Sequence, residues 1–399
     1  MDVRLCVVGG ELQGIEALYL AKKAGYRTIL IDKKDRPPAL RLADEFYKID
    51  VVKEGDAAKR VFAGVDAILP ALEKVDVLLK LEKICKSMGL PFLQDNAAFM
   101  TTSDKLKAIE CFDKWGIPHP NLYPHARYPL IIKPVFGSGG RGVRLVRNRV
   151  ELEESIEKFR RQGEKYLIQE YVAGSFLSLE LLGFRGISRP MQITWLEFDE
   201  NYSCKRVLAP CPLSREVKEK VIALGERLVE GLNLTGLTDI QPVLQGEEVK
   251  VIEANARLPS QTPTVVYQST GLNMVELLCD LFLNERLPSF KLSREEAVIY
   301  QHITIACGRL KVVGEHYMCV PGIELRKEFF GASEALTNFF NCEGANAFVA
   351  TLIVRGGSLR EAKRRMERVI ESIMSEYKIN GLEDSSPPGV LSLYDKIDA

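Results

Sequence analysis

The chain has 399 residues, of which 46% are apolar and 27% charged, and its 54 basic side chains balance its 54 acidic ones. This composition is typical of a soluble protein of about two or three domains, and the zero net charge gives no reason to expect a nucleic-acid partner. Nine cysteines without a CxxC pair and four histidines without an HxxxH pair predict reduced thiols, a cytoplasmic location and no zinc site. No apolar stretch reaches the roughly 20 residues of a membrane span, so no membrane partner is expected.

The first hundred residues alternate predicted strands and helices. Apolar runs predict strands at 4–10, 26–34, 43–51 and 65–72, and helical periodicity predicts helices at 12–25, ended by Gly25, and at 73–89. This alternation is typical of a parallel sheet covered by helices. A helix at 103–116, capped by Ser103, and a Pro- and His-rich linker at 117–129 follow.

Beyond the linker the pattern is mixed. The expected elements are strands at 130–135, 143–147, 165–172 and 347–354 and helices at 149–163, 215–233 and 358–377. We predict three domains, at 1–100, 101–183 and 184–399. The C-terminal strand and helix have two open roles, docking on the body of the protein or forming a homodimer contact.

Two glycine-rich loops are candidate ligand sites. The first, from Gly9 to Gly14, has the spacing GGxxxG and therefore does not match the dinucleotide fingerprint GxGxxG. It is either a tight turn that needs small residues or a loop that touches a ligand. Asp32, at the end of the second predicted strand, and Asp50, in the third, are candidate cofactor contacts.

The second loop, Gly137 to Gly142, joins two predicted strands and lacks a GK[ST] ending, which excludes a P-loop. A flexible glycine hairpin can lay backbone N–H groups over phosphates. Lys133 precedes it on an otherwise apolar strand, where a buried ammonium needs an anionic partner. A triphosphate would be such a partner, and a surface edge strand is the alternative explanation.

Polar residues alternate in the segment VIEANARLPSQTPT. Glu253, Asn255 and Arg257 project to one face of a strand. Asp239 and Gln241 repeat the pattern on the preceding strand. Asp239, Glu253 and Asn255 together give oxygen ligands suited to Mg²⁺ held with phosphates. Arg257 is then placed to grip a phosphoryl or carboxylate oxygen.

Lys105, Lys133, the glycine hairpin, QEYVAG and IEANAR follow one another as they do in ATP-grasp ligases, which the chain resembles. GGELQGIEALYLAKKAG and EANARLPSQTPTVVYQSTGLNMVELL further resemble PylC, the pyrrolysine-biosynthesis ligase family. The resemblance covers most of the chain and fades in the last hundred residues. It implies an ATP-grasp fold with an N-terminal Rossmann-like parallel sheet, a small glycine-hairpin lid lobe and a larger α+β body.

The same resemblance implies an ADP-forming carbon–nitrogen ligase that uses ATP and Mg²⁺. The carboxylate of (3R)-3-methyl-D-ornithine, or of D-ornithine, would be phosphorylated by ATP and then attacked by the ε-amine of L-lysine. Implied catalytic residues are Arg257, Lys133 and Lys105, and implied metal ligands are Asp239, Gln241, Glu253 and Asn255. ATP would contact Lys105, Lys133, Ser138, Gly139, Gly140, Gln169, Glu170, Tyr171 and Val172. The lysine would contact Leu12, Gln13 and Glu73, and the ornithine Ser178, Leu179, Glu180, Ser260, Gln261, Thr262, Pro263 and Thr264.

The sequence departs from the ATP-grasp pattern at three positions. Gln241 stands where an acid is expected and Asn255 replaces a possible aspartate, so a second Mg²⁺ would bind more weakly. Phe176 occupies the place of a ribose-binding glutamate. Glu11 has no assigned role beyond a helix N-terminal acid.

Four alternative functions stay open. The first two are an ATP-grasp ligase for another amino-acid pair and a bicarbonate carboxylase, although no biotinyl MKM tract is present. The other two are an NAD-dependent oxidoreductase built on the N-terminal sheet and a noncatalytic nucleotide sensor.

Overall fold

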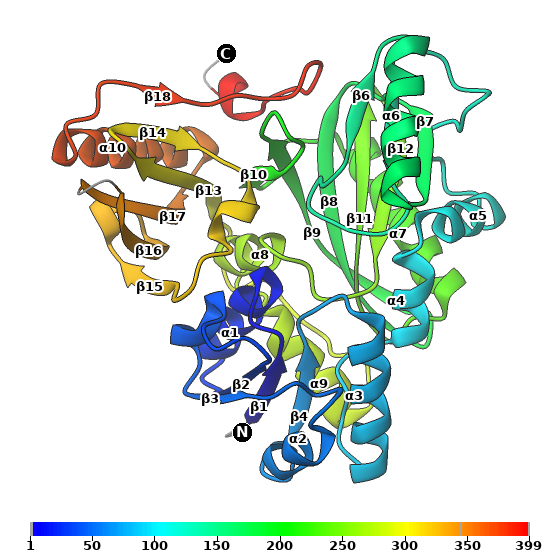
Figure 1. Cartoon of the computed structure of the whole chain (residues 1–399), viewed down its shortest axis with the longest axis vertical. Helices are drawn as coiled ribbons and strands as arrows, with labels where there is room; N and C mark the ends of the chain where they lie inside the picture. Colours follow the sequence, from blue (N-terminus) through cyan, green and yellow to red (C-terminus); the bar gives the residue numbers. More distant parts are fainter. Residues whose placement is uncertain (1–2, 343–344, 398–399) are drawn as a thin grey trace.

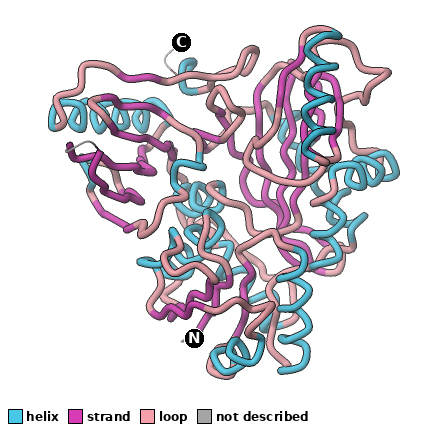
Figure 2. Tube along the Cα trace, in the orientation of Figure 1, coloured by secondary structure: helices cyan, strands magenta, loops and turns pink. Residues whose placement is uncertain are grey.

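Three β-sheets organise the chain, and the computed structural model describes residues 3–342 and 345–397 of it. In Figure 1 the four-stranded sheet forms the base, the three-stranded sheet lies at the upper right, and the eleven-stranded sheet crosses to the upper left. Figure 2 shows long strands at the upper right and a second group of strands at the left. The predicted order of a parallel sheet, a small hairpin lobe and a larger α+β body is confirmed.

The N-terminal sheet is parallel, with strand order β3-β2-β1-β4. Its strands are apolar runs because helices cover them, as in other parallel sheets. The elements are β1 (Arg4–Val8), α1 (Leu12–Lys23), β2 (Arg27–Asp32), η1 (Pro38–Leu42), β3 (Glu45–Lys48), α2 (Gly55–Phe62), β4 (Ala67–Pro70) and α3 (Val75–Met88).

Two helices lead from this sheet to the small lobe. They are α4 (Asn96–Thr102) and α5 (Lys105–Trp115), and residues 117–129 form no helix or named strand, in line with the predicted linker. The small sheet has the order β6-β5-β7. It consists of β5 (Leu130–Pro134), β6 (Arg144–Val146) and β7 (Tyr166–Glu170), with α6 (Arg149–Gln162) packed on β6.

The large sheet has the core order β12-β11-β8-β9-β10-β13-β17-β16-β15. All but the last residue of β8 falls in the predicted 101–183 unit, but this strand pairs with β9 and β11 of the large sheet. The strands are β8 (Ser175–Phe184), β9 (Ile187–Phe198), β10 (Cys204–Ala209), β11 (Gly236–Gln245), β12 (Glu248–Asn255), β13 (Ala297–Ala306), β14 (Arg309–Val312), β15 (Glu324–Lys327), β16 (Glu334–Cys342), β17 (Ala345–Gly356) and β18 (Leu382–Glu383). The helices are α7 (Arg215–Leu232), α8 (Thr262–Thr270), α9 (Met274–Asn284), α10 (Leu359–Glu376), and the short η2 (Glu315–Met318), η3 (Phe329–Gly331) and η4 (Tyr394–Lys396).

The C-terminal strand and helix dock on the body. β17 pairs with β13 from Ala297–Gly356 to Ile305–Phe348, and α10 packs against both strands. The apolar stripe of α10 includes Met366 and Ile373, both fully buried. Docking therefore accounts for the hydrophobic pattern of this part of the sequence.

Two predicted helix boundaries were wrong. Asp104 caps α5 by accepting hydrogen bonds from the N–H groups of Leu106 and Lys107, while Ser103 ends α4. Ala24, not Gly25, is the C-cap of α1, and Gly25 follows with a positive φ of 74°. None of the described helices is long and apolar enough to cross a bilayer.

A buried charge network ties the C-terminal tail to the large sheet. Arg206 on β10 donates to Glu197 (2.5 Å), Gln301 (2.7 Å) and Asp384 (2.6 Å), and its guanidinium lies 4.0 Å from the centre of the Tyr394 ring. The side chains of Arg206 and Glu197 are almost completely buried. This network fixes the path of the tail across the top of the molecule in Figure 1.

We expect Arg206→Met to lower the free energy of unfolding by about 3–5 kcal/mol, because it leaves the Glu197 carboxylate buried without its cation. Urea unfolding followed by circular dichroism measures the change. The matched control is Arg215→Met, which removes an exposed pair with Glu219 and should cost at most about 0.5 kcal/mol. Equal effects of the two substitutions would contradict the structural role given to the network.

Candidate active site

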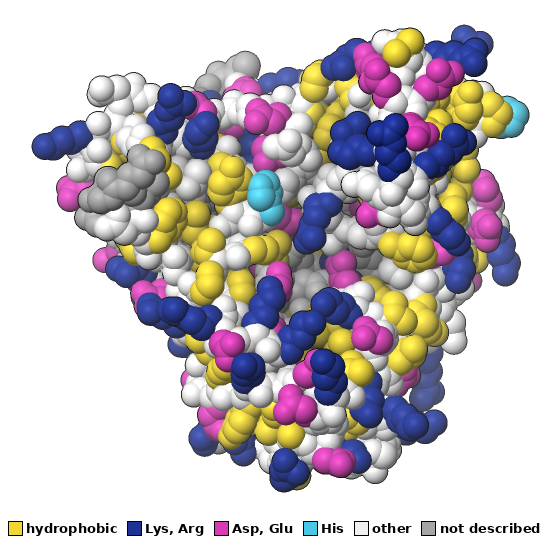
Figure 3. Space-filling model, in the orientation of Figure 1, with side chains coloured by type: hydrophobic (Ala, Val, Ile, Leu, Met, Phe, Trp, Pro, Cys, Tyr) yellow, Lys and Arg dark blue, Asp and Glu magenta, His cyan; other side chains and the backbone are white. Residues whose placement is uncertain are grey.

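A cavity of about 890 Å³ lies where the three sheets meet. Figure 3 shows it as a hollow near the centre of the face, with Lys and Arg side chains around its rim. Residues of the N-terminal sheet, the glycine hairpin and the large sheet all line it. Segments far apart in the sequence therefore line one shared cavity.

One wall of the cavity is formed by β11 and β12. Their antiparallel register sets Asp239 opposite Asn255 and Gln241 opposite Glu253, so the four side chains share one face, as predicted. The amide groups of Gln241 and Asn255 each donate to Asp239 Oδ2 over 3.1 Å. Burial raises the pKa of Asp239, and its Oδ1 has no hydrogen-bond partner in the described structure.

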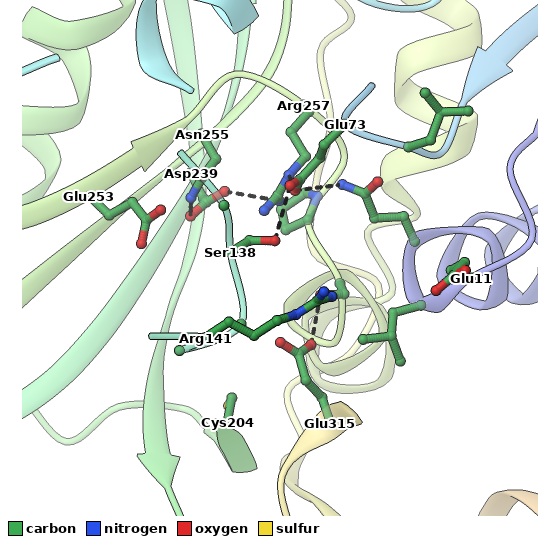
Figure 4. Close-up of a pocket in the computed structure, with 18 of the residues that line it drawn as sticks. Glu11, Glu73, Ser138, Arg141, Cys204, Asp239, Glu253, Asn255, Arg257 and Glu315 are labelled. Atoms are coloured by element: carbon green, nitrogen blue, oxygen red, sulfur yellow. Dashed lines mark hydrogen bonds and ion pairs between the residues drawn. The ribbon is translucent and has the colours of Figure 1, made fainter. Parts of the chain in front are cut away.

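Arg257 follows β12 and reaches the centre of the cavity, between two acids. Its Nε donates to Glu73 Oε1 over 2.8 Å, and its Nη1 lies 3.7 Å from Asp239 Oδ1. Glu73 also accepts from Gln13 (3.4 Å) and from Ser138 of the glycine hairpin (3.0 Å). Figure 4 shows Arg257, Glu73 and Ser138 grouped beside Asp239. Burial by itself would raise the pKa of Glu73, but the Arg257 charge and these hydrogen bonds hold it below its ordinary value.

Two lysines occupy the side of the cavity beneath the hairpin. Lys133 lies on β5, the central strand of its sheet, so the surface-edge explanation is excluded. Its Nζ donates to the carbonyl of Ile252 over 3.2 Å, and burial lowers its pKa to about 8, while the charge of Glu253 opposes this only in part. Lys105 donates to the Gly137 carbonyl over 2.6 Å and lies 3.4 Å from Glu253 Oε1.

The glycine hairpin covers these lysines and packs closely on a neighbouring turn. At Gly140, where φ is 72°, an added Cβ would lie 2.2 Å from the carbonyl oxygen of Tyr202. A larger residue would therefore push the hairpin away from the body. The position needs glycine for contact as well as for backbone conformation.

The segment 169–172, implied to contact ATP, also lines the cavity, but many of its polar groups form hydrogen bonds within the fold. The N–H groups of Glu170 and Tyr171 donate to the carbonyls of Asn121 and Pro129. The Glu170 carboxylate pairs with Lys250 and accepts from Asn121. Gln169 and Val172 complete this edge.

The first glycine loop is a tight turn that also faces the cavity, so its two interpretations are compatible. An added Cβ at Gly14 would lie 2.3 Å from the Gly9 carbonyl oxygen, and Asp32 accepts from the N–H of Gly10 over 2.8 Å. Leu12 and Gln13 line the cavity together with Asp32 and Asp50. Asp32 and Asp50 both use their carboxylates to brace backbone N–H groups. Glu11 forms an ion pair with Lys34.

The turn after β12 is strained. Gln261 has φ 74° and ψ −58°, and the N–H of Thr262 donates to the Ser260 carbonyl over 3.0 Å, which makes a γ-turn. This conformation costs about 1–3 kcal/mol and persists only when its surroundings hold it. Glu315 holds it by accepting from Ser260 Oγ (3.0 Å) and Gln261 Nε2 (2.5 Å). No local pattern in the sequence pointed to Glu315, which lies 54 residues away on η2.

Four predicted substrate contacts lie behind the cavity wall. Leu179 points into the core on the opposite face of β8, because strand side chains alternate, so its side chain does not reach the cavity. Glu180 is fully buried, which raises its pKa to about 8, and it accepts from Ser178 over 2.6 Å. Pro263 and Thr264 lie in the first turn of α8, beneath the γ-turn. Ser178 and Thr262 do face the cavity.

Side-chain composition limits the metal chemistry of the site. Across residues 3–342 and 345–397 no group of three His, Cys, Asp or Glu side chains converges on one point. Asp239 and Glu253 supply two carboxylates, and Gln241 and Asn255 supply amide oxygens. Such a set suits Mg²⁺ that takes its remaining ligands from phosphates and water.

Comparison with known proteins finds relatives that match most of the chain. The ATP-grasp domain family matches residues 102–261. The 3-methyl-D-ornithine–L-lysine ligase of Methanosarcina mazei is 33% identical over 94% of this chain and 96% of its own length. The enzyme of the same name from Methanosarcina acetivorans is 34% identical over 90% of this chain and 95% of its own length.

Solved structures agree on the fold. The biotin carboxylase domain of 2-oxoglutarate carboxylase from Hydrogenobacter thermophilus, solved as a dimer with MgADP, ADP and bicarbonate, superposes with a TM-score of 0.71. The alignment covers 93% of this chain and 90% of that domain, at 18% identity. The predicted fold class is confirmed.

Lys133→Met is expected to raise the free energy of unfolding of the ligand-free protein by about 2–3 kcal/mol at pH 7. The folded state lowers the pKa of Lys133 to about 8, so the unfolded chain binds more protons between that value and the ordinary one. The cost of burying the ammonium is therefore fully present below pH 8 and disappears as the pH rises from about 8 toward 10.5. Urea unfolding at pH 7 and pH 9.5 measures the gain and its decrease as the pH rises through this window. Lys250→Met, which removes a lysine paired with Glu170, is the control and should give no stabilisation.

Proposed function

Because the chain belongs to the 3-methyl-D-ornithine–L-lysine ligase family of ATP-grasp enzymes, we propose that it joins these two amino acids. An amide bond would form between the carboxylate of (3R)-3-methyl-D-ornithine and the ε-amine of L-lysine, with conversion of ATP to ADP and phosphate. The chain is an ATP-dependent, ADP-forming carbon–nitrogen ligase. The observation that carries the proposal is the convergence of Arg257, Glu73 and the two lysines in one cavity.

The residues present fit ATP and Mg²⁺. Lys133 is a buried ammonium with no carboxylate within 4 Å among the described residues, which suits a polyphosphate partner. Lys105, Ser138, Gly139 and Gly140 surround the same space. Asp239 Oδ1, buried and without a hydrogen-bond partner, is available to a cation, as is the carboxylate of Glu253. Mg²⁺ held there would neutralise charge on the transferred phosphoryl group.

The first step makes an acyl phosphate. A carboxylate oxygen of the ornithine bonds to the γ-phosphorus of ATP, and the bond from that phosphorus to the bridging oxygen breaks, which releases ADP. Lys105 and Lys133 hold the phosphates in line with the carboxylate. Arg257 stabilises the charge on the transferring oxygens. Positioning and electrostatic stabilisation are the main contributions that phosphoryl transfer requires of a protein.

The second step forms the amide. The neutral ε-amine of lysine attacks the acyl carbon, and the tetrahedral intermediate loses phosphate. Leu12, Gln13 and Glu73 line the N-terminal side of the cavity and are proposed to hold the lysine. Ser178, Ser260, Gln261 and Thr262 line the cavity on the side of the large sheet and are proposed to hold the ornithine.

Three finer predictions belong to this proposal. The cysteines whose side chains the structure describes form no disulfide with one another, in keeping with a cytoplasmic enzyme. A preference for 3-methyl-D-ornithine over D-ornithine rests on one methyl group, worth about 1 kcal/mol in a pocket. A homodimer stays a prediction, because the dimeric neighbour is only 18% identical.

The proposal predicts that purified protein with Mg-ATP forms amide product only when lysine and the ornithine are both present. ADP release with each amino acid alone, with D-ornithine plus lysine, and with 3-methyl-D-ornithine plus lysine measures substrate dependence. Mass spectrometry should find the sum of the two amino acids less one water. Turnover with an unrelated pair of amino acids, and none with these two, would retain the fold and overturn the substrate assignment.

Arg257→Lys is expected to lower kcat by about 10²–10³-fold, because an ammonium cannot reproduce the guanidinium contacts with Glu73 and with transition-state oxygens. Steady-state ADP release with both amino acids measures it. Arg215→Lys, on the exposed face of α7, is the control and should keep the wild-type rate. An unchanged kcat in Arg257→Lys would remove Arg257 from the mechanism.

A further inference from the structure

The attacking amine raises a protonation problem that the proposed mechanism leaves open. Free lysine carries its ε-amine as an ammonium, with a pKa of about 10.4, and only the neutral amine is a nucleophile. A carboxylate in the cavity has to take the proton as the amine approaches. Such a group must lie near the acyl phosphate and must not already be neutralised by a cation.

The three carboxylates around Arg257 do not meet this requirement. Glu73 is neutralised by Arg257 and accepts two further hydrogen bonds. Asp239 is bonded to Gln241 and Asn255 and also faces Arg257. Glu253 lies 3.4 Å from Lys105 and belongs to the proposed metal site.

Glu315 differs from all three. Its Oε2 accepts from two neutral donors, Ser260 and Gln261, and it forms no ion pair within 4 Å with a Lys, Arg or His nitrogen of the described residues. It is nevertheless about nine-tenths buried and lines the cavity. A buried carboxylate without a paired cation is costly and suggests that the bound state supplies one.

Glu315 lies between the glycine hairpin and the 260–264 turn. Oε1 would lie 3.2 Å from a Cβ added at Gly139, so this oxygen lies at the tip of the glycine hairpin, above the proposed phosphate site. Oε2 braces the 260–264 turn, which is proposed to hold the ornithine. Figure 4 shows the Glu315 carboxylate directed from η2 toward the group of residues around Arg257. An anion at this place would repel the transferred phosphoryl group unless a cation came between them, and the arriving ammonium is that cation.

We propose that Glu315 is the catalytic base that accepts the proton from the ε-ammonium of lysine. The inference rests on the proposed function. An N–H bond of the ammonium breaks as an O–H bond forms on Glu315, and the freed electron pair makes the C–N bond to the acyl carbon. The carbonyl reforms as the carbon–oxygen bond to phosphate breaks, and the second proton on nitrogen leaves with the phosphate as HPO₄²⁻. Glu315 then returns its proton to solvent.

The surroundings of Glu315 favour proton uptake. Burial raises its pKa above the ordinary value, although its hydrogen bonds and the Arg257 charge oppose this. The charged and titratable groups that face it are Arg141 in the hairpin, Arg257, Glu73, Glu16 on α1, Tyr300 on β13, Cys204 on β10 and Cys319 after η2. Of the two cations, Arg257 is already paired with Glu73, and Arg141 belongs to the hairpin that covers the proposed phosphate site.

The test compares two nucleophiles in Glu315→Gln. The substituted amide would keep an oxygen for Ser260 and Gln261 but could not accept the proton. With lysine and 3-methyl-D-ornithine at pH 7, we expect amide formation to fall by about 10²-fold or more. With hydroxylamine in place of lysine, hydroxamate formation should stay near the wild-type rate, because that nucleophile is already neutral. The lysine rate of Glu315→Gln should climb with pH as free amine becomes available, and Glu315→Asp should recover part of it.

The control is Glu82→Gln. Glu82 also accepts from a side-chain amide, that of Asn96 over 2.8 Å, but it lies on α3 outside the cavity, so both rates should match the wild type. An equal loss with both nucleophiles would place Glu315 in ornithine binding or in folding and overturn the inference. A raised KM for lysine with unchanged kcat would make it an anchor instead of a base. A wild-type protein that forms hydroxamate but never couples lysine would instead refute the proposed acceptor.

Discussion

The ion pair between Arg257 and Glu73 joins parts of the chain that are 184 residues apart. Arg257 follows β12 of the large sheet, and Glu73 follows β4 of the N-terminal sheet. Ser138 of the glycine hairpin donates a hydrogen bond to the same Glu73 carboxylate. One guanidinium therefore links all three lobes at the place where the reacting groups must meet. Because Asp239 lies on its other side, Arg257 also connects this link to the proposed metal site. Loss of the pair would change the relative positions of the substrates as well as the charge.

Several charged side chains of this cavity are buried in the ligand-free protein. Lys133 is a buried cation, and Asp239 and Glu315 are buried acids with raised pKa values. Each costs folding free energy in the ligand-free protein. Polyphosphate, Mg²⁺ and the two amino acids would bring the opposite charges. Binding would then pair the buried side chains and recover the folding free energy that they cost in the ligand-free protein. The strained γ-turn at Gln261 belongs to the same pattern, since it is held by an acid that faces the cavity.

The structural features that were predicted correctly from the sequence are those that depend on local residue patterns. Alternation along 251–257 predicted a polar face, and the β11–β12 register confirms that Asp239, Gln241, Glu253 and Asn255 share it. The glycine spacing predicted the hairpin between β5 and β6. Glu315 was not predictable, because only the folding of a later segment onto the 260–264 turn gives it a role. The side chain of Leu179 was misplaced because neighbours in a strand point to opposite faces, so a run of three residues cannot all face one ligand.

The two amides in the proposed metal site follow from this arrangement. Asp239 receives hydrogen bonds from both Gln241 and Asn255, which an acid at either position could not donate when ionised. The amides therefore keep one buried carboxylate fixed beside Arg257 and avoid placing four like charges together. With amides at positions 241 and 255, the two carboxylates of Asp239 and Glu253 remain for the proposed metal site. The proposed site would favour a single Mg²⁺ completed by phosphate oxygens, because a second divalent ion would lack anionic ligands from the protein. Arg257, fixed between Asp239 and Glu73, would then supply at the transferred group, in the proposed mechanism, the positive charge that a second metal would otherwise bring.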